Sequence, residues 1–168
     1  NTFAGRLILG PFICSWMFFS SELKALLSGT TKNLNAWLLH FLLICPVMFW
    51  VMAVCHLSFV EYLIYFVYPG LSFSLIRSFI EHRPGPTNEE SSVIVEAALP
   101  FQILFLNNNF HHVHHSKPWL PWYRIKDSYR RDKAEILQTN GEFKFNGYSE
   151  IASKYLFKPK DSPVHPDL

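Results

Sequence analysis

The feature that most limits how this chain can fold is a long segment that is almost free of charge. Residues 33–76 number 44 and contain one formally charged side chain, Glu61. A helix rises about 1.5 Å per residue, so this segment would extend about 66 Å, roughly two crossings of a ~30 Å hydrocarbon core. We therefore expect two membrane-spanning helices, at about 36–55 and 59–78. The alternative is a hairpin buried in a soluble core, but buried helices seldom run so long without polar side chains.

Charges flank this segment unevenly. Arg77 and Arg83 follow the second expected helix, and residues 117–133 carry six basic side chains against two acidic ones. An excess of Lys and Arg beside a membrane span marks the cytoplasmic side. Two crossings return the chain to the side from which it started. We therefore expect the loop that precedes residue 36 and the whole of residues 79–168 to be cytosolic.

The other segments are predicted from the residues that interrupt them. Residues 5–27 are apolar but contain Gly10, Pro11 and two charges near their end. This pattern favours an interfacial or re-entrant segment over a third span. The tail from Asn140 contains several Gly and Pro residues and is expected to be mostly irregular. The predicted fold class is all-α, with multi-pass transmembrane helices and a histidine-rich cytosolic cap.

Composition excludes several other classes of protein. The net charge is only +2, so the chain lacks the basic character of a nucleic-acid-binding domain. Its three cysteines, Cys14, Cys45 and Cys55, have no CxxC spacing, which argues against a disulfide framework and a structural zinc site. No glycine-rich fingerprint for a flavin or nicotinamide is present, so redox electrons would have to come from another protein.

Four of the eight histidines lie in the run 111–115. We expect a helix that begins at Pro100 and continues to Ser116, because Pro is favoured in the first helical turn. Successive helical residues are about 100° apart, so three imidazoles and one amide share an arc of about 100°, while His112 falls outside it. The members of this face are Asn107, His111, His114 and His115.

This face predicts a metal site. His111, His114 and His115 are the expected ligands, and Asn107 is a weaker ligand or supports one. Imidazole binds Fe, Zn, Cu and Ni, so ligand type alone does not choose the metal. A histidine cluster without a metal is the alternative, but histidines at i, i+3 and i+4 beside a membrane surface rarely serve packing alone. Glu81 is a candidate to orient a ligand, as metal-bound imidazoles usually require, and His112 remains a candidate for a similar role.

The pattern His111-x-x-His114-His115 resembles the third histidine box, HxxHH, of the membrane fatty acid desaturases. The residues around it agree, with Asn107-Asn108-Asn109-Phe110 before the box and Pro118-Trp119-Leu120-Pro121-Trp122-Tyr123-Arg124 after it. Upstream, Arg77-Ser78-Phe79-Ile80-Glu81-His82-Arg83 resembles the segment that supplies an additional histidine ligand in many bacterial members. The resemblance covers most of residues 60–165 and indicates the C-terminal half of such a domain.

The resemblance implies an O2-dependent oxidoreductase that desaturates the acyl chain of a lipid or acyl thioester at a histidine-ligated centre of two non-haem Fe ions. It adds His82 to the ligands and implies a ferredoxin or cytochrome b5-like electron donor on the cytosolic face of a membrane, such as the bacterial inner membrane. The family's first two boxes, HxxxH and HxxHH, precede the two spans and are absent from residues 1–168. Without their ligands, we expect a 168-residue fragment to be inactive.

Two other functions stay open. A carotenoid ketolase or another lipid hydroxylase would share the HxxHH box and the Pro- and Trp-rich residues that follow it. A non-catalytic membrane metal-binding protein would keep the histidines without the chemistry. The roles of Glu61, His40 and His56 are not determined by the sequence, and neither are the substrate, the bond position and the electron donor.

Overall fold

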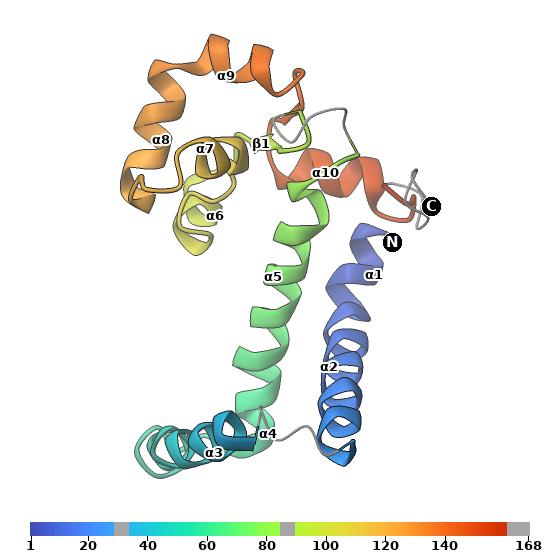
Figure 1. Ribbon diagram of the computed structural model, residues 1–168, viewed down its shortest axis with the longest axis vertical. Coiled ribbons are helices and arrows are strands. Elements are labelled where there is room, and N and C mark those ends of the chain that lie inside the picture. The colour runs from blue at the N-terminus through green and yellow to red at the C-terminus, as the bar shows by residue number, and fades with distance from the viewer. Residues whose placement is uncertain (29–33, 85–89, 161–168) are drawn as a thin grey trace. The chain divides into compact units, whose positions relative to one another are not determined.

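The computed structural model describes residues 1–28, 34–84 and 90–160, which are mostly helical (Figure 1). The chain divides into two compact units. Unit 1 comprises Asn1–Leu7 and Ser74–Leu168, and unit 2 comprises Ile8–Phe73. The cytosolic cap predicted from the sequence therefore falls in unit 1, and the apolar segments fall mainly in unit 2.

Unit 2 is a series of helices. They are the end of α1 (Phe3–Ile8), α2 (Gly10–Leu27), α3 (Leu34–Phe49), the π-helix η2 (Trp50–Val54), α4 (Phe59–Tyr62), the π-helix η3 (Leu63–Val67) and the beginning of α5 (Tyr68–Glu81). Among the described residues, the continuous helical stretches Leu34–Val54 and Phe59–Glu81 are long and apolar enough to cross a membrane. Helices thus form over both predicted spans, and their crossing of a membrane stays a prediction.

The single acidic residue of the apolar segment caps a helix. Ser58 precedes α4, and its hydroxyl accepts a hydrogen bond from Glu61 N. Glu61 Oε2 in turn accepts from Ser58 N at 2.8 Å and from Ser58 Oγ at 2.7 Å. This reciprocal capping box satisfies backbone N–H groups that the helix itself leaves without partners. It gives Glu61 a structural role that the sequence left undetermined.

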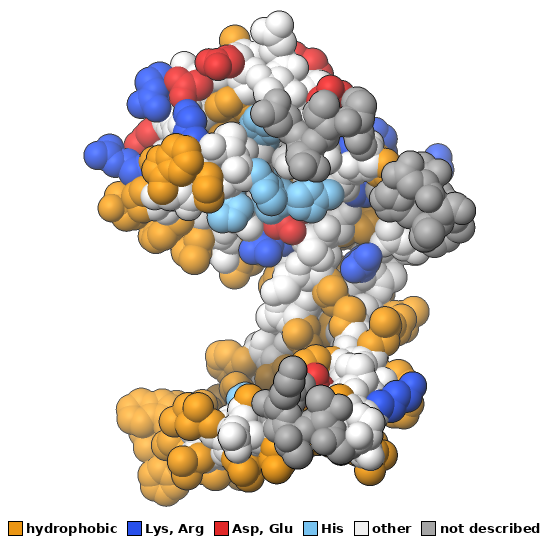
Figure 2. All heavy atoms as spheres, viewed as in Figure 1, with side chains coloured by type: hydrophobic (Ala, Val, Ile, Leu, Met, Phe, Trp, Pro, Cys, Tyr) orange, Lys and Arg blue, Asp and Glu red, His pale blue; other side chains and the backbone are white. Residues whose placement is uncertain are grey.

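Apolar side chains of unit 2 are exposed on all sides of its helices. Leu42 and Phe49 are each 69% exposed, and none of the apolar window within Leu34–Val54 is buried. Figure 2 shows apolar side chains over much of this unit. A helix that is apolar all round requires an apolar environment. The described residues do not supply one, so they do not form the soluble buried hairpin that was the alternative.

Unit 1 contains shorter elements around a small sheet. After α5 come β1 (Ile94–Val95), α6 (Leu99–Leu104), α7 (His111–Ser116), α8 (Trp122–Arg131), α9 (Lys133–Thr139), β2 (Lys144–Phe145) and α10 (Tyr148–Tyr155). β1 and β2 are parallel, with Ile94 opposite Lys144 and Val95 opposite Phe145. The all-α prediction omitted this sheet. The prediction of a mostly irregular tail from Asn140 did not include β2 and α10, which bury apolar side chains there.

The core of unit 1 lies on both sides of β1. Successive side chains of a strand point to opposite faces. Val93 and Val95 join a cluster that also contains Phe3, Ile76, Phe79, Ile80, Ala97, Phe105, Phe143, Phe145, Tyr148 and Ile151. Ile94 joins a second cluster with Phe110, Val113, Ile125, Tyr129 and Ile136. The short strand therefore links α5 and α10 on one face to α7, α8 and α9 on the other.

The helix predicted from Pro100 to Ser116 is interrupted. α6 ends at Leu104, and α7 begins at His111. Between them, Leu106 and Asn107 have φ angles of 50° and 56°, a left-handed conformation that Asn tolerates better than most residues. The buried Asn109 explains the break, because it pairs with Val95 twice. Its side-chain Nδ2 donates to Val95 O at 2.7 Å, and its backbone O accepts from Val95 N at 2.8 Å. This pairing with β1 is incompatible with a continuing helix.

Candidate metal centre

The end of α5 and the strand-like residues after it position His82. His82 forms an isolated antiparallel bridge with Ser92. On either side of it, Val93 N donates to Glu81 O at 3.0 Å and Arg83 N donates to Ser91 O at 2.9 Å. Because the backbone is held on both sides, the direction of the His82 side chain follows from the pairing of two chain segments about ten residues apart.

Helix α7 positions the other histidines. Val113 is fully buried in the second core cluster, and the backbone N of His112 donates to Val93 O at 3.1 Å. These contacts fix one face of α7 against β1. His111 and His115, which are four residues apart, lie on the same face one turn apart, as the helical period requires.

Three imidazoles converge at this point. His111 Nε2 lies 3.1 Å from His82 Nε2 and 3.0 Å from His115 Nε2. One nitrogen from each of these residues lies within 4.8 Å of the other two, and this is the only such group of potential metal ligands found among the described residues. Figure 2 shows histidine side chains gathered on one face of unit 1.

Local electrostatics keep these imidazoles neutral. Burial, followed by the nearby His115 and His82, lowers the pKa of His111 from its usual value to about 3. Burial, followed by His115 and Lys160, lowers the pKa of His82, and burial, followed by His114 and His112, lowers the pKa of His115. Cations side by side disfavour one another, and a buried charge is disfavoured by desolvation. The group therefore offers neutral nitrogen donors near pH 7.

Two predicted histidines lie outside this group. The His114 ring is exposed and its centroid lies 5.9 Å from that of His111 and 5.7 Å from that of His115, which places it beside the three imidazoles. His112 is buried on another face of α7. The prediction that His111 and His115 adjoin each other agrees with the structure, while His82 joins them through the tertiary fold.

Asn107 does not lie where the predicted helix placed it. Because α6 ends before it, Asn107 does not share a helix face with the histidines, and its Nδ2 donates to Trp122 O at 3.0 Å. Glu81, by contrast, lies next to the group, with Oε1 at 3.6 Å from His111 Nδ1 and at 2.8 Å from Arg77 Nε. Asn108, whose Oδ1 lies 3.2 Å from His111 Nδ1, was not among the residues predicted for the site. Its position three residues before His111 was the available signal.

The donor set fits a transition metal. Three converging neutral imidazole nitrogens are ligands that iron and zinc both accept. The three Nε2 atoms also lie close enough together for a single metal ion to bind between them. His82, His111 and His115 are the residues placed to hold an ion, with His114 adjacent.

A comparison with protein-family models matches residues 2–145 to the fatty acid desaturases. The chain belongs to this family. No curated protein and no solved structure matches it. Membership accounts for both apolar helices and the histidine group, since both lie within the matched residues. It confirms the resemblance inferred from the HxxHH box and from the His82 segment, and it makes lipid-modifying redox chemistry the expected class of activity.

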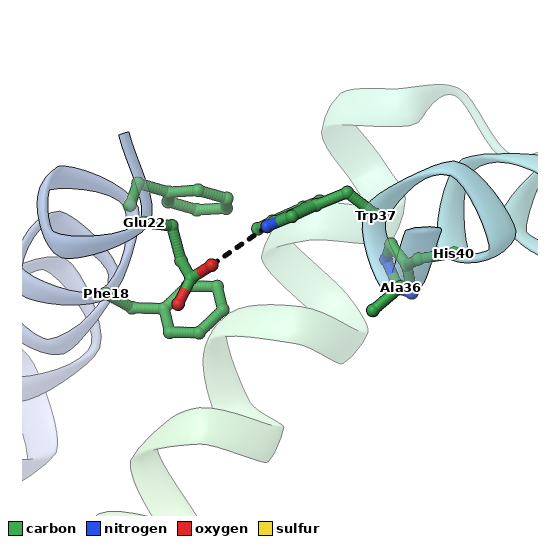
Figure 3. A pocket seen from close by; sticks show the side chains of 6 residues that line it. Phe18, Glu22, Ala36, Trp37 and His40 are labelled. Carbon is green, nitrogen blue, oxygen red and sulfur yellow. Dashed lines mark hydrogen bonds between the residues drawn. The ribbon is translucent and has the colours of Figure 1, made fainter. Parts of the chain in front are cut away.

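A pocket also lies in unit 2. It has a volume of about 440 Å³ and is lined by Phe18, Phe19, Glu22, Ala36, Trp37 and His40. Figure 3 shows Glu22 of α2 and Trp37 of α3 directed toward each other, and Trp37 Nε1 donates to Glu22 Oε2 at 2.9 Å. The ring of His40 contacts that of Trp37 edge-on. Glu22 and His40 are the two potential metal ligands in this lining, and they are not part of a group of three among the described residues. The histidine group of unit 1 therefore remains the candidate site.

Proposed function

We propose that the chain forms part of an O2-dependent membrane oxidoreductase that desaturates the acyl chain of a lipid or acyl thioester. The observation that carries the proposal is the convergence of His82, His111 and His115 in a member of the fatty acid desaturase family. Two bound Fe ions would supply the oxidising power to break an unactivated C–H bond, which no protein acid or base can deprotonate.

The chain's own residues would bind and orient the metal. His82, His111 and His115 present neutral nitrogens, and His114 is the nearest further imidazole. Four histidines are too few for two irons, so the remaining ligands would come from the family's first two histidine boxes. Arg77 would hold the Glu81 carboxylate in place beside His111, where the carboxylate would face the positive charge that a metal introduces.

The surroundings proposed for this site are a membrane and a redox partner. The apolar stretches Leu34–Val54 and Phe59–Glu81 support a multi-pass membrane location. The Lys and Arg residues after the second stretch support a cytosolic site, as on a bacterial inner membrane. An acyl chain would enter from the lipid, and a ferredoxin or cytochrome b5-like protein would deliver electrons from the cytosol.

The test is expression of the full-length protein, with analysis of acyl lipids and pigments and of metal in the purified protein. We expect new double bonds in acyl chains, iron in the protein, and loss of both in His111→Ala. His56→Asn is the matched control, because His56 lies outside the histidine group and has a φ of 56° that Asn tolerates. Oxygenated carotenoids without acyl change would contradict acyl desaturation. Zinc or no metal would instead favour the non-catalytic alternative.

A further inference from the structure

An imidazole that binds a metal through one nitrogen must carry its proton on the other. At His111 the converging atom is Nε2, which faces His82 and His115. A lone pair on Nε2 requires the ring proton to be on Nδ1. A hydrogen-bond acceptor beside Nδ1 selects this tautomer and fixes the plane of the ring.

Asn108 supplies that acceptor. Its Oδ1 lies 3.2 Å from His111 Nδ1, so the ring N–H donates to an amide carbonyl oxygen. The other end of the same amide faces a carboxylate, with Nδ2 donating to Glu81 Oε1 at 3.4 Å. The reverse orientation would direct the amide N–H groups at the ring N–H and the carbonyl at the carboxylate. Both contacts would then be repulsive, so the two neighbours define one orientation.

Glu81 is itself held in place. Its Oε1 forms an ion pair with Nε of Arg77, 2.8 Å away and one helical turn earlier on α5. The same oxygen is 3.6 Å from His111 Nδ1, beyond hydrogen-bonding distance. Asn108 therefore bridges a gap that the carboxylate alone does not close. The four residues form one chain of contacts in the order Arg77, Glu81, Asn108, His111.

The interruption between α6 and α7 brings Asn108 into position. The left-handed Leu106 and Asn107 turn the backbone, and Asn108 N donates to Phe105 O at 2.9 Å. Asn108 then precedes α7 by three residues and is half-buried. Its neighbours Asn107 and Asn109 direct their Nδ2 atoms to backbone carbonyls instead, so of this run only Asn108 has its side chain on the histidine group.

We propose that Asn108 is a positioning residue. Its side-chain amide connects the Glu81 carboxylate to His111 through two hydrogen bonds and thereby holds Nε2 of His111 toward the metal. The inference rests on the proposed metal-binding function. It differs from the sequence-based hypothesis, in which Asn107 was the amide that supports the site.

The experiment measures the affinity of the purified full-length protein for Co²⁺ and Fe²⁺ by competition with a chelator, and the visible absorption of bound Co²⁺. In Asn108→Leu we expect a 10- to 100-fold loss of affinity and a changed absorption band, because the Nδ1 proton loses its acceptor. Asn108→Ser is a second variant with a smaller side chain. Asn107→Gly is the matched control, since Gly accepts the left-handed conformation, and it should change affinity less than about threefold.

A conservative pair separates positioning from simple packing. Glu81→Gln combined with Asn108→Asp keeps one amide and one carboxylate, and it keeps an oxygen facing His111 Nδ1. It should restore affinity to within about fivefold of the wild type. Thermal unfolding of the metal-free variants checks that they are folded. The inference is overturned if the wild type binds metal and both single Asn108 variants bind it as tightly as the wild type does. It is also overturned if the paired variant binds metal no more tightly than Asn108→Leu. A wild type that binds no metal overturns the proposed function as well.

Discussion

The two units of this chain differ in how much of their apolar side-chain surface they bury. In unit 1, side chains such as Ile80, Val113 and Ile151 are buried in the two core clusters, and almost none of their surface is exposed. In unit 2, residues as apolar as Leu42 are exposed along helices that bury few side chains among the described residues. Unit 1 therefore carries its own core, while unit 2 depends on an external apolar environment such as lipid.

The same contrast applies to charged groups. In unit 1, Glu96 accepts hydrogen bonds from Tyr129, Lys133 and Lys144, which joins three elements around the sheet. In unit 2, the Glu61 carboxylate caps its own helix through Ser58, three residues earlier. Long-range polar contacts hold unit 1 together and fix the histidine group, whereas the contacts of unit 2 are mostly within a helix. Three changes test this difference.

The largest effect is expected in the core. Ile151→Ala removes a fully buried side chain and should reduce the stability of unit 1 by about 2–5 kcal/mol, because the packed core cannot fill the cavity. Leu42→Ala, at an exposed position, should change the stability of unit 2 by less than about 1 kcal/mol in detergent. Hydrogen exchange of peptides from α10 and α3 measures both. Equal losses in the two units would remove the distinction between them.

An intermediate, pH-dependent effect is expected at Glu96. Burial alone would raise the pKa of this carboxyl, but hydrogen bonds from Lys133, Tyr129 and Lys144 outweigh it and lower the pKa to about 2. Because the folded pKa lies below the unfolded value of about 4.3, the stabilisation is complete above that value and is lost as the pH falls toward 2.

Glu96→Gln should therefore destabilise unit 1 by about 1–3 kcal/mol at pH 7, and the difference from the wild type should close between about pH 4.5 and pH 2. Thermal unfolding at a series of pH values measures this difference. Glu135→Gln, on the exposed face of α9, is the matched control and should have little effect. A pH-independent difference would mean that the Glu96 charge is not what joins the three elements.

The smallest effect is expected at the capping box of unit 2. Ser58→Ala removes the hydroxyl that accepts from Glu61 N and should destabilise the start of α4 by about 1 kcal/mol. Hydrogen exchange at the first amides of α4 measures the change. Ser20→Ala, whose hydroxyl donates to Met17 O, is the control and should have a smaller effect. A loss that spreads beyond α4 and α5 would show that unit 2 is more cooperative than its local contacts indicate.

Local periodicity accounts for the predictions that agree with the structure. The adjacency of His111 and His115 depends only on the helical repeat, and α7 needs no more than six residues to realise it. The two apolar helices likewise follow from composition over about twenty residues each. Both predictions used residues that are close in sequence, where backbone geometry is nearly independent of the rest of the fold.

The predictions that were wrong depended on contacts between distant residues. Pro100 does open a helix, but the pairing of Asn109 with Val95 ends it, and Asn107 then lies between two helices instead of on the face of α7. The run of three Asn residues was a turn signal that could have weakened the prediction of a continuous helix. The helix α10 was missed because its apolar residues gain their stabilisation from α5 and β1, which are far away in sequence.

The sequence by itself determined the family, the apolar helices and the pairing of two histidines one helical turn apart, since each depends on composition or on a local repeat. The resemblance implied His82 as a further ligand, but only the tertiary structure decided how His82 meets them and that Asn108, instead of Asn107, contacts His111. His82 and His111 are 29 residues apart and are brought together by the pairing of residues 81–83 with 91–93 and by the packing of α7 on β1. Such contacts are set by where buried backbone groups find partners, which no short window of sequence specifies.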